Sequence, residues 1–119
     1  VVSWGAMVRD VDKAIVALEN EGHSIEHIDL RTISPIDKET IIKSVEKTGR
    51  FVVVHEAATT YGPGAELISI VNEGAFLSLE APPTRVSSPD IIIPLPKGEH
   101  HYLVSPDHIK NELKKIIEF

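Results

Sequence analysis

The hydrophobic positions in the first half of the chain change period several times. Short strands are predicted at Val1–Trp4 and Ile25–Leu30, and the continuous apolar run Phe51–Val54 predicts a central strand covered on both faces of a parallel sheet. Between these runs, apolar residues recur every three or four positions over Met7–Glu21 and between the expected N-cap Asp37 and Gly49. This is the spacing of helices that bury one face. Strands and helices are therefore expected to alternate.

The second half of the chain continues the alternation but is interrupted by prolines. Residues Gly64–Gly74 predict a third helix, and Arg85–Val86 and Ile91–Ile93 predict short extended pieces. A last helix is expected from Ser105–Asp107, because a serine N-cap, a proline in the first turn and an early acid are typical helix starts. The proline-rich stretch Ala81–Gly98 predicts a surface segment with one edge strand, since proline cannot donate to a sheet ladder.

This order of elements predicts the α/β class, with a mostly parallel sheet and right-handed crossovers. We expect a three-layer α/β/α arrangement with about five strands, and one domain over residues 1–119. The chain opens on "VVSWG", already inside a predicted strand, so we expect this domain to be a fragment of a longer chain.

Composition narrows the classes of partner. The net charge of −6 disfavours nucleic acid, whose phosphates need a basic surface. No apolar run approaches the roughly 20 residues of a membrane span, so no membrane partner is expected. The chain has no cysteine, which excludes disulfides and thiolate metal ligands and is compatible with a cytoplasmic location.

The residues most suggestive of chemistry follow the central apolar run. His55 and Glu56 lie at an expected carboxyl end of a strand, where open α/β sheets bind ligands, and the next loop leads into a helix N-terminus that favours anions. One interpretation is an acid/base pair, and the other is a polar pair that ties the strand end to a loop or a neighbouring subunit. The turn Tyr61–Gly64 lacks the lysine and hydroxyl residue of a phosphate-binding P-loop, so its glycines are interpreted as backbone hinges.

No other cluster predicts a catalytic or metal site. His100 and His101 are adjacent, and neighbours on an extended chain point to opposite sides, so no metal site is expected there or with His108. Nothing in the pattern identifies an activated serine, so no Ser-His-Asp arrangement and no catalytic residue is expected. Trp4 and Phe51 are assigned to the core.

Several motifs, taken in order, resemble one known family nearly end to end. The chain is similar to the C-terminal, transketolase-like domain of the β subunit of 2-oxo acid dehydrogenase E1 components, which are thiamine-diphosphate enzymes of the pyruvate and branched-chain complexes. The segments that carry the resemblance are "VVSWGAMV" at Val1–Val8, Ile28–Ala57, "GAEL" at Gly64–Leu67, "FLSLEAPPTRV" at Phe76–Val86 with Asp90 beyond it, and "SPDHI" at Ser105–Ile109.

The chain departs from this family pattern in two places. The family loop usually carries paired glycines and then an aromatic or aliphatic residue before Gly-Ala-Glu. Here Tyr61 replaces the first glycine and Pro63 replaces the apolar residue, which predicts a stiffer loop. The segment after Asp90, "IIIPLPKGEHHY", also diverges, so the substrate is not predicted.

The resemblance implies a division of labour within a heterotetramer of two α and two β subunits. Thiamine diphosphate and Mg²⁺ would be held by the E1 α subunit and the N-terminal part of β, with none bound by this domain alone. The domain would serve β–β assembly and docking of the E2 acyltransferase, in the cytoplasm or, in a eukaryote, the mitochondrial matrix. The implied interface or structural residues are His55, Glu56, Tyr61, Gly62, Gly64, Glu66 and Arg85, and the implied E2-docking residues are Glu112, Glu118 and Phe119.

Two other interpretations remain open from the sequence. The same domain occurs in transketolases and related sugar-phosphate synthases, although "LEAP…RV" argues against them. The chain would otherwise be a stand-alone α/β module that binds a small anion at the helix starting near Gly64.

Overall fold

The computed structural model describes all 119 residues and contains one parallel sheet. Its strands are β1 (Val2–Ser3), β2 (Ile28–Asp29), β3 (Val52–Ala58) and β4 (Thr84–Ser88), in the order β2-β1-β3-β4. All neighbouring pairs are parallel, and Val2 pairs with residues of both β2 and β3. The predicted α/β class is therefore confirmed, and β4 is the edge strand expected from the proline-rich stretch.

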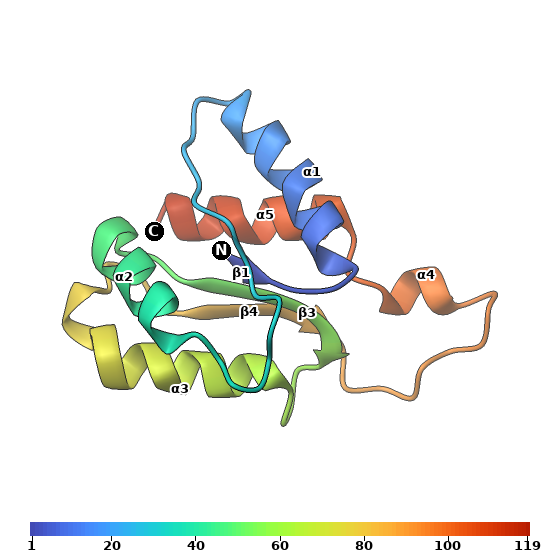
Figure 1. Cartoon of the computed structure of the whole chain (residues 1–119). Helices are drawn as coiled ribbons and strands as arrows, with labels where there is room; N and C mark the ends of the chain where they lie inside the picture. The colour runs from blue at the N-terminus through green and yellow to red at the C-terminus, as the bar shows by residue number, and fades with distance from the viewer.

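Four helices cover the two faces of the sheet. Helices α1 (Met7–Glu19) and α5 (Pro106–Ile117) lie together on one face, and α2 (Lys38–Thr48) and α3 (Pro63–Ala75) lie together on the other (Figure 1). The predicted three-layer arrangement is confirmed. None of these helices has the length and apolar character needed to cross a membrane.

Side chains of the central strand β3 alternate between two separate cores. Val52 and Val54 pack with α1 and α5, whereas Val53 packs with α2 and α3. This explains why the run at residues 51–54 is continuously apolar: every residue in it is buried, whichever face it points to.

Helix ends follow the expected chemistry. The Asp37 carboxylate accepts from the Thr40 backbone N–H at 3.1 Å, and α2 stops at Gly49, which has a φ of 68°. The Ser105 hydroxyl accepts from the His108 backbone N–H at 3.2 Å and begins α5. Local sequence therefore sets all three of these boundaries.

The sheet has four strands rather than about five. Residues 91–93, expected to be a short extended piece, form an exposed loop that pairs with no strand, in a segment that projects from the body of the molecule (Figure 1). The preceding residue, Asp90, bonds to Thr60 and carries the chain away from the sheet edge after β4. Two short elements were not expected: a 3-10 turn at Phe76–Ser78 and α4 (Glu99–Tyr102).

Candidate functional site at the carboxyl edge of the sheet

His55 lies beneath the first turn of α3, inside the protein. Its side chain is on the same face of β3 as Val53 and is 1% exposed. The imidazole stacks on the indole of Trp4, with ring centroids 5.6 Å apart and planes 15° apart. Neither ring nitrogen has a hydrogen-bond partner. His55 therefore acts in packing, beside the residue that follows β1.

The glycines of the following turn leave room for this ring. A Cβ on Gly64 would lie 2.5 Å from His55 Nε2, and a Cβ on Gly62 would lie 2.8 Å from His55 Cε1 and 2.3 Å from the Ala58 carbonyl oxygen. Neither glycine has a positive φ. These glycines are thus required by close approach and not by hinge conformation, which corrects the sequence-based interpretation.

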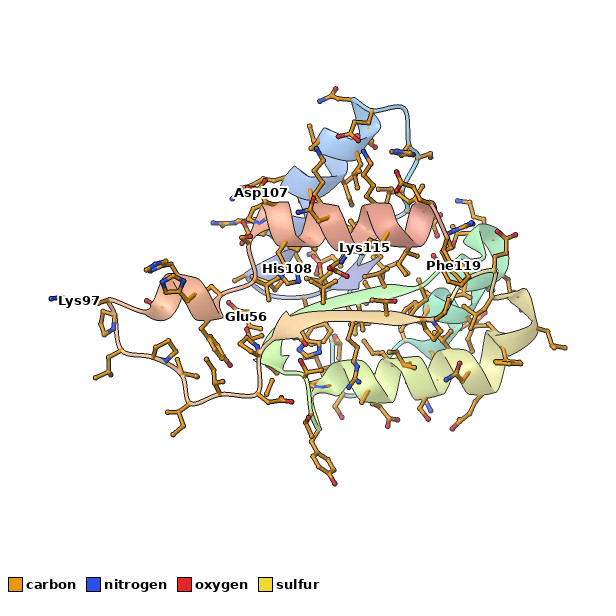
Figure 2. All side chains as sticks on the ribbon, turned by 180° about the vertical axis from the view of Figure 1, so that it is seen from behind. Glu56, Lys97, Asp107, His108, Lys115 and Phe119 are labelled. Atoms are coloured by element: carbon orange, nitrogen blue, oxygen red, sulfur yellow. The ribbon has the colours of Figure 1, made fainter.

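The geometry does not form an acid/base pair from His55 and Glu56. The Glu56 side chain is exposed, and it lies on the opposite face of β3 from His55, because consecutive residues of a strand alternate between faces (Figure 2). Burial, and secondarily the nearby Arg85 guanidinium, lower the pKa of His55 from its usual 6.5, so the imidazole is neutral at pH 7. With no exposed nitrogen, His55 cannot exchange a proton with a bound substrate.

Two residues of the "RV…D" segment clamp the loop after β3. The Asp90 carboxylate accepts from the Thr60 backbone N–H at 2.8 Å and from the Thr60 hydroxyl at 2.6 Å. These bonds from Thr60 hold the pKa of Asp90 below its usual value. The Arg85 guanidinium donates to the Thr59 carbonyl oxygen at 2.8 Å. Arg85 and Asp90, which lie 26 and 30 positions after their partners in the sequence, thereby fix the path of the turn at Thr59 and Thr60.

This clamped turn presents Tyr61 to solvent. The Tyr61 side chain is 99% exposed, and its φ of 58° lies in the left-handed region that L residues other than glycine rarely adopt. Pro63 then begins α3, and the Glu66 side chain is exposed in its first turn. An apolar cavity of about 230 Å³ opens beside this helix start, lined by Trp4, Leu30, Ile33, Ile36, Pro63, Glu66 and Leu67.

A Ser-His-Asp hydrogen-bond chain exists that the sequence pattern did not reveal. Ser3 Oγ lies 2.7 Å from His27 Nε2, and His27 Nδ1 lies 2.9 Å from the Asp12 carboxylate. Ser3 is fully buried, so its hydroxyl is closed to a substrate. The three residues come from β1, the approach to β2 and α1, and no sequence motif relates them. Their bonds tie these elements together.

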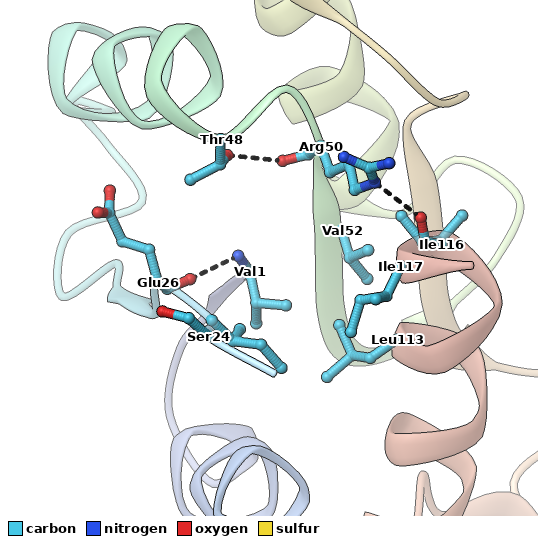
Figure 3. A pocket seen from close by; sticks show the side chains of 10 residues that line it. Val1, Ser24, Glu26, Thr48, Arg50, Val52, Leu113, Ile116 and Ile117 are labelled. Carbon is cyan, nitrogen blue, oxygen red and sulfur yellow. Dashed lines mark hydrogen bonds between the residues drawn. The ribbon is translucent and has the colours of Figure 1, made fainter. Parts of the chain in front are cut away.

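A second cavity, of about 250 Å³, lies at the opposite edge of the sheet, beside the C-terminal end of α5 (Figure 3). Arg50 Nε donates to the Ile116 carbonyl oxygen at 2.9 Å, and the Val1 ammonium donates to the Glu26 carbonyl oxygen at 2.8 Å. Burial lowers the pKa of the Val1 ammonium from 8.0 to about 6. Six of the ten lining residues are hydrophobic.

The predicted E2-docking residues lie along α5 and at its end, away from the loop at Lys97 (Figure 2). Phe119 is 72% exposed and lines a surface hollow with apolar residues of the segment at 76–83. Glu112 pairs with Lys115 at 2.6 Å, and Lys114 pairs with Glu21 at 2.7 Å. Lys114 and Lys115, whose positive charges would repel a basic partner, are therefore each paired with a carboxylate.

The chain was compared with known proteins. A family model described as the transketolase C-terminal domain matches residues 1–109. The pyruvate dehydrogenase E1 component subunit beta of Acholeplasma laidlawii is 55% identical over 116 residues, which are 98% of this chain and 36% of that protein. The corresponding subunits of Staphylococcus aureus strain Mu50 and Bacillus subtilis strain 168 are 46% and 44% identical, over 100% of this chain and 37% of each relative.

One solved structure supports the fold. A split-gene transketolase, described as an inactive beta4 tetramer, superposes with a TM-score of 0.82 at 22% identity, over 98% of this chain and 38% of that one. The chain spans a little over a third of the length of the curated relatives it matches. It belongs to the transketolase C-terminal domain family and is similar, over nearly its whole length, to the β subunits of pyruvate dehydrogenase E1 components.

Proposed function

We propose that this chain is the C-terminal assembly and E2-docking domain of the β subunit of a 2-oxo acid dehydrogenase E1 enzyme. The observation that carries the proposal is the 55% identity to a pyruvate dehydrogenase E1 β subunit across 98% of the chain. The complete enzyme, a heterotetramer of α and β subunits, would oxidatively decarboxylate a 2-oxo acid, with pyruvate favoured over branched-chain substrates. It would transfer the acyl group to the lipoyl group of E2, in the cytoplasm or, in a eukaryote, the mitochondrial matrix.

The cofactor belongs elsewhere in this proposal. Thiamine diphosphate, which supplies the carbanion chemistry of such enzymes, needs a diphosphate site and Mg²⁺ ligands. The residues of this chain do not fit either group. Pro63 removes an N–H from the first turn of α3, Glu66 adds a negative charge there, and no three metal-ligating side chains gather at one place. The same features weigh against the small-anion-binding module.

An assembly role is supported by the surface around the site. Tyr61, Ile92 and Leu95 are each at least 85% exposed, whereas His55 is buried as part of the scaffold. The bonds between Thr60 and Asp90 join the turn that carries Tyr61 to the residue that precedes the exposed loop at 91–95. An apolar group of this kind is typical of an interaction surface. We therefore assign Tyr61 and this loop to a subunit contact, with Gly62, Gly64 and Arg85 shaping the turn.

E2 docking is supported by a different surface. Phe119 and its apolar neighbours at 76–83 would form the contact area, and Glu118 would supply negative charge near the end of α5. The net charge of −6 would draw a basic binding domain toward this surface.

The function is tested by producing the β subunit that carries this chain together with its α subunit. The purified complex would be supplied with thiamine diphosphate, Mg²⁺ and a lipoyl domain, and assayed with pyruvate and with branched-chain 2-oxo acids. Acylation of the lipoyl domain, fastest with pyruvate, is the expected result. An assembled, cofactor-loaded complex that acylates nothing, or that transfers ketol groups between sugar phosphates, would contradict the proposal.

A further inference from the structure

Two properties of Tyr61 do not help this chain fold. Its side chain makes almost no contact within the molecule, since it is 99% exposed. Its backbone has a φ of 58°, a conformation that costs free energy for a residue with a Cβ. Its neighbours are nevertheless held in place, by Asp90 at Thr60 and by Arg85 at Thr59. The fold thus holds the backbone at residue 61 in place and presents an aromatic ring outside its own surface.

A cavity of a size that suits such a ring lies beside the start of α3, with Pro63, two residues after Tyr61, in its lining. Its volume is about 230 Å³, and an apolar cavity of about 150 Å³ already holds benzene in another protein. Five of its seven lining residues are hydrophobic, among them Trp4 and Ile36. Glu66 is the only charged residue in the lining. The cavity therefore suits a group with an apolar body and one hydroxyl donor, which is the chemistry of a tyrosine side chain.

We propose that Tyr61 of one copy inserts into this cavity on a second copy of the chain, and that the second copy does the same in return. A contact with twofold symmetry joins the same surface of both copies. The projecting side chain and the cavity that receives it must therefore lie on one surface of each copy. Tyr61 and the cavity residue Pro63 satisfy this condition, being separated by Gly62 alone. The Glu66 carboxylate would accept the phenol O–H of the partner ring. The strained, preorganised loop limits the entropy lost on binding.

This inference rests on the assembly role proposed above and specifies it. The second copy is favoured over a different protein because the chain itself presents the group that the cavity accepts.

The experiment places a photo-crosslinking amino acid, p-benzoylphenylalanine, at residue 61 of the β subunit in the complex with its α subunit. Illumination should give a product of twice the β-subunit mass, and peptide mapping should locate the link in residues 30–36 or 63–67. The same amino acid at Val16, an exposed position on α1, is the control and should give no such product. A link to the α subunit, a link within one chain, or no product from an assembled complex would overturn the inference.

Two substitutions at Tyr61 separate the contribution of the ring to association from the cost of the positive φ to stability. Tyr61→Gly should raise thermal stability, because glycine tolerates a positive φ, yet weaken β–β association by roughly tenfold or more, as loss of an aromatic anchor does. Tyr61→Phe should weaken association by no more than about fivefold, the effect of one neutral hydrogen bond. Association unchanged in Tyr61→Gly would refute the exchange. If the β–β product forms but no 2-oxo acid is decarboxylated, the proposed reaction fails while the contact stands.

Discussion

The imidazole of His55 occupies the space that any side chain at residue 64 would need. A Cβ on Gly64 would lie 2.5 Å from His55 Nε2, which is shorter than the distances that Cβ atoms keep from other heavy atoms in proteins. His55 ends the buried part of β3 and Gly64 lies in the first turn of α3, so this contact sets how closely the helix approaches the sheet. The histidine of the His-Glu pair and the glycines of the Gly-Pro-Gly turn therefore pack against one another.

The first prediction concerns this pair. Gly64→Ala should lower the free energy of unfolding by about 1–3 kcal/mol through overpacking, and His55→Ala should lower it by about 2–4 kcal/mol by leaving a cavity. In the His55→Ala background, Gly64→Ala should be neutral within about 1 kcal/mol, because the obstructing ring is gone. Urea unfolding of the four variants measures the coupling. His101→Ala, at an exposed position, is the control, and additive single effects would contradict the proposed contact.

The second prediction concerns pH. Burial lowers the folded-state pKa of His55 below 6.5, so the unfolded chain binds more protons in that range. The unfolding free energy should therefore fall as pH falls below 6.5, and the contribution should level off below the folded-state pKa. The measurement is the unfolding free energy of wild type minus that of His55→Leu. This quantity should decrease as the pH is lowered from 7 to 5, because only wild type loses stability through His55. A value that does not change with pH would rule out a buried neutral His55.

The third prediction concerns the clamp on the loop. Asp90→Asn and Thr60→Val should each speed hydrogen exchange at the amides of residues 59–62, because both remove bonds that hold the turn. In the assembled enzyme, the same variants should weaken subunit association, since Tyr61 would no longer be held in place. Asp107→Asn, in the exposed first turn of α5, is the matched control. Exchange at the loop equal to wild type would mean that these bonds do not constrain it.

The fourth prediction concerns E2. Binding of an E2 subunit-binding domain to the assembled E1 should weaken strongly between about 0.05 and 0.5 M salt, because salt screens exposed charges. Removing Glu118 and Phe119 should weaken it further, through loss of the exposed ring and of the Glu118 charge. Calorimetry or surface plasmon resonance measures both effects, with Val16→Ala as the control. Affinity indifferent to salt and to truncation would place the docking surface elsewhere.

The fifth prediction concerns the cofactor. Calorimetric titration of this chain with thiamine diphosphate and Mg²⁺ should give no saturable heat, because Pro63 and Glu66 make the start of α3 a poor diphosphate site. The complete E1 enzyme serves as the positive control. Micromolar binding by the chain alone would contradict the proposed division of labour.

Local chemistry in the sequence was enough to predict most of the fold. Asp37 and Ser105 cap helices through residues three positions away, and the apolar run at 51–54 is buried on both faces because β3 is central. Such signals act over a few residues, so they do not depend on the rest of the chain. The segment at 91–93, predicted as a short extended piece, does not join the sheet, because Asp90 bonds to Thr60 and directs the chain away from the edge strand β4.

The site depended on contacts that no local pattern encodes. The sequence identified His55, Gly62 and Gly64, but only the tertiary structure placed the ring under the glycines and on Trp4. The bonds from Asp90 to Thr60 and from Arg85 to Thr59 span 30 and 26 residues, and the Ser3–His27–Asp12 chain joins three elements. Side-chain geometry at such separations follows from how strands and helices pack, which is decided when the sheet and its two layers of helices come together.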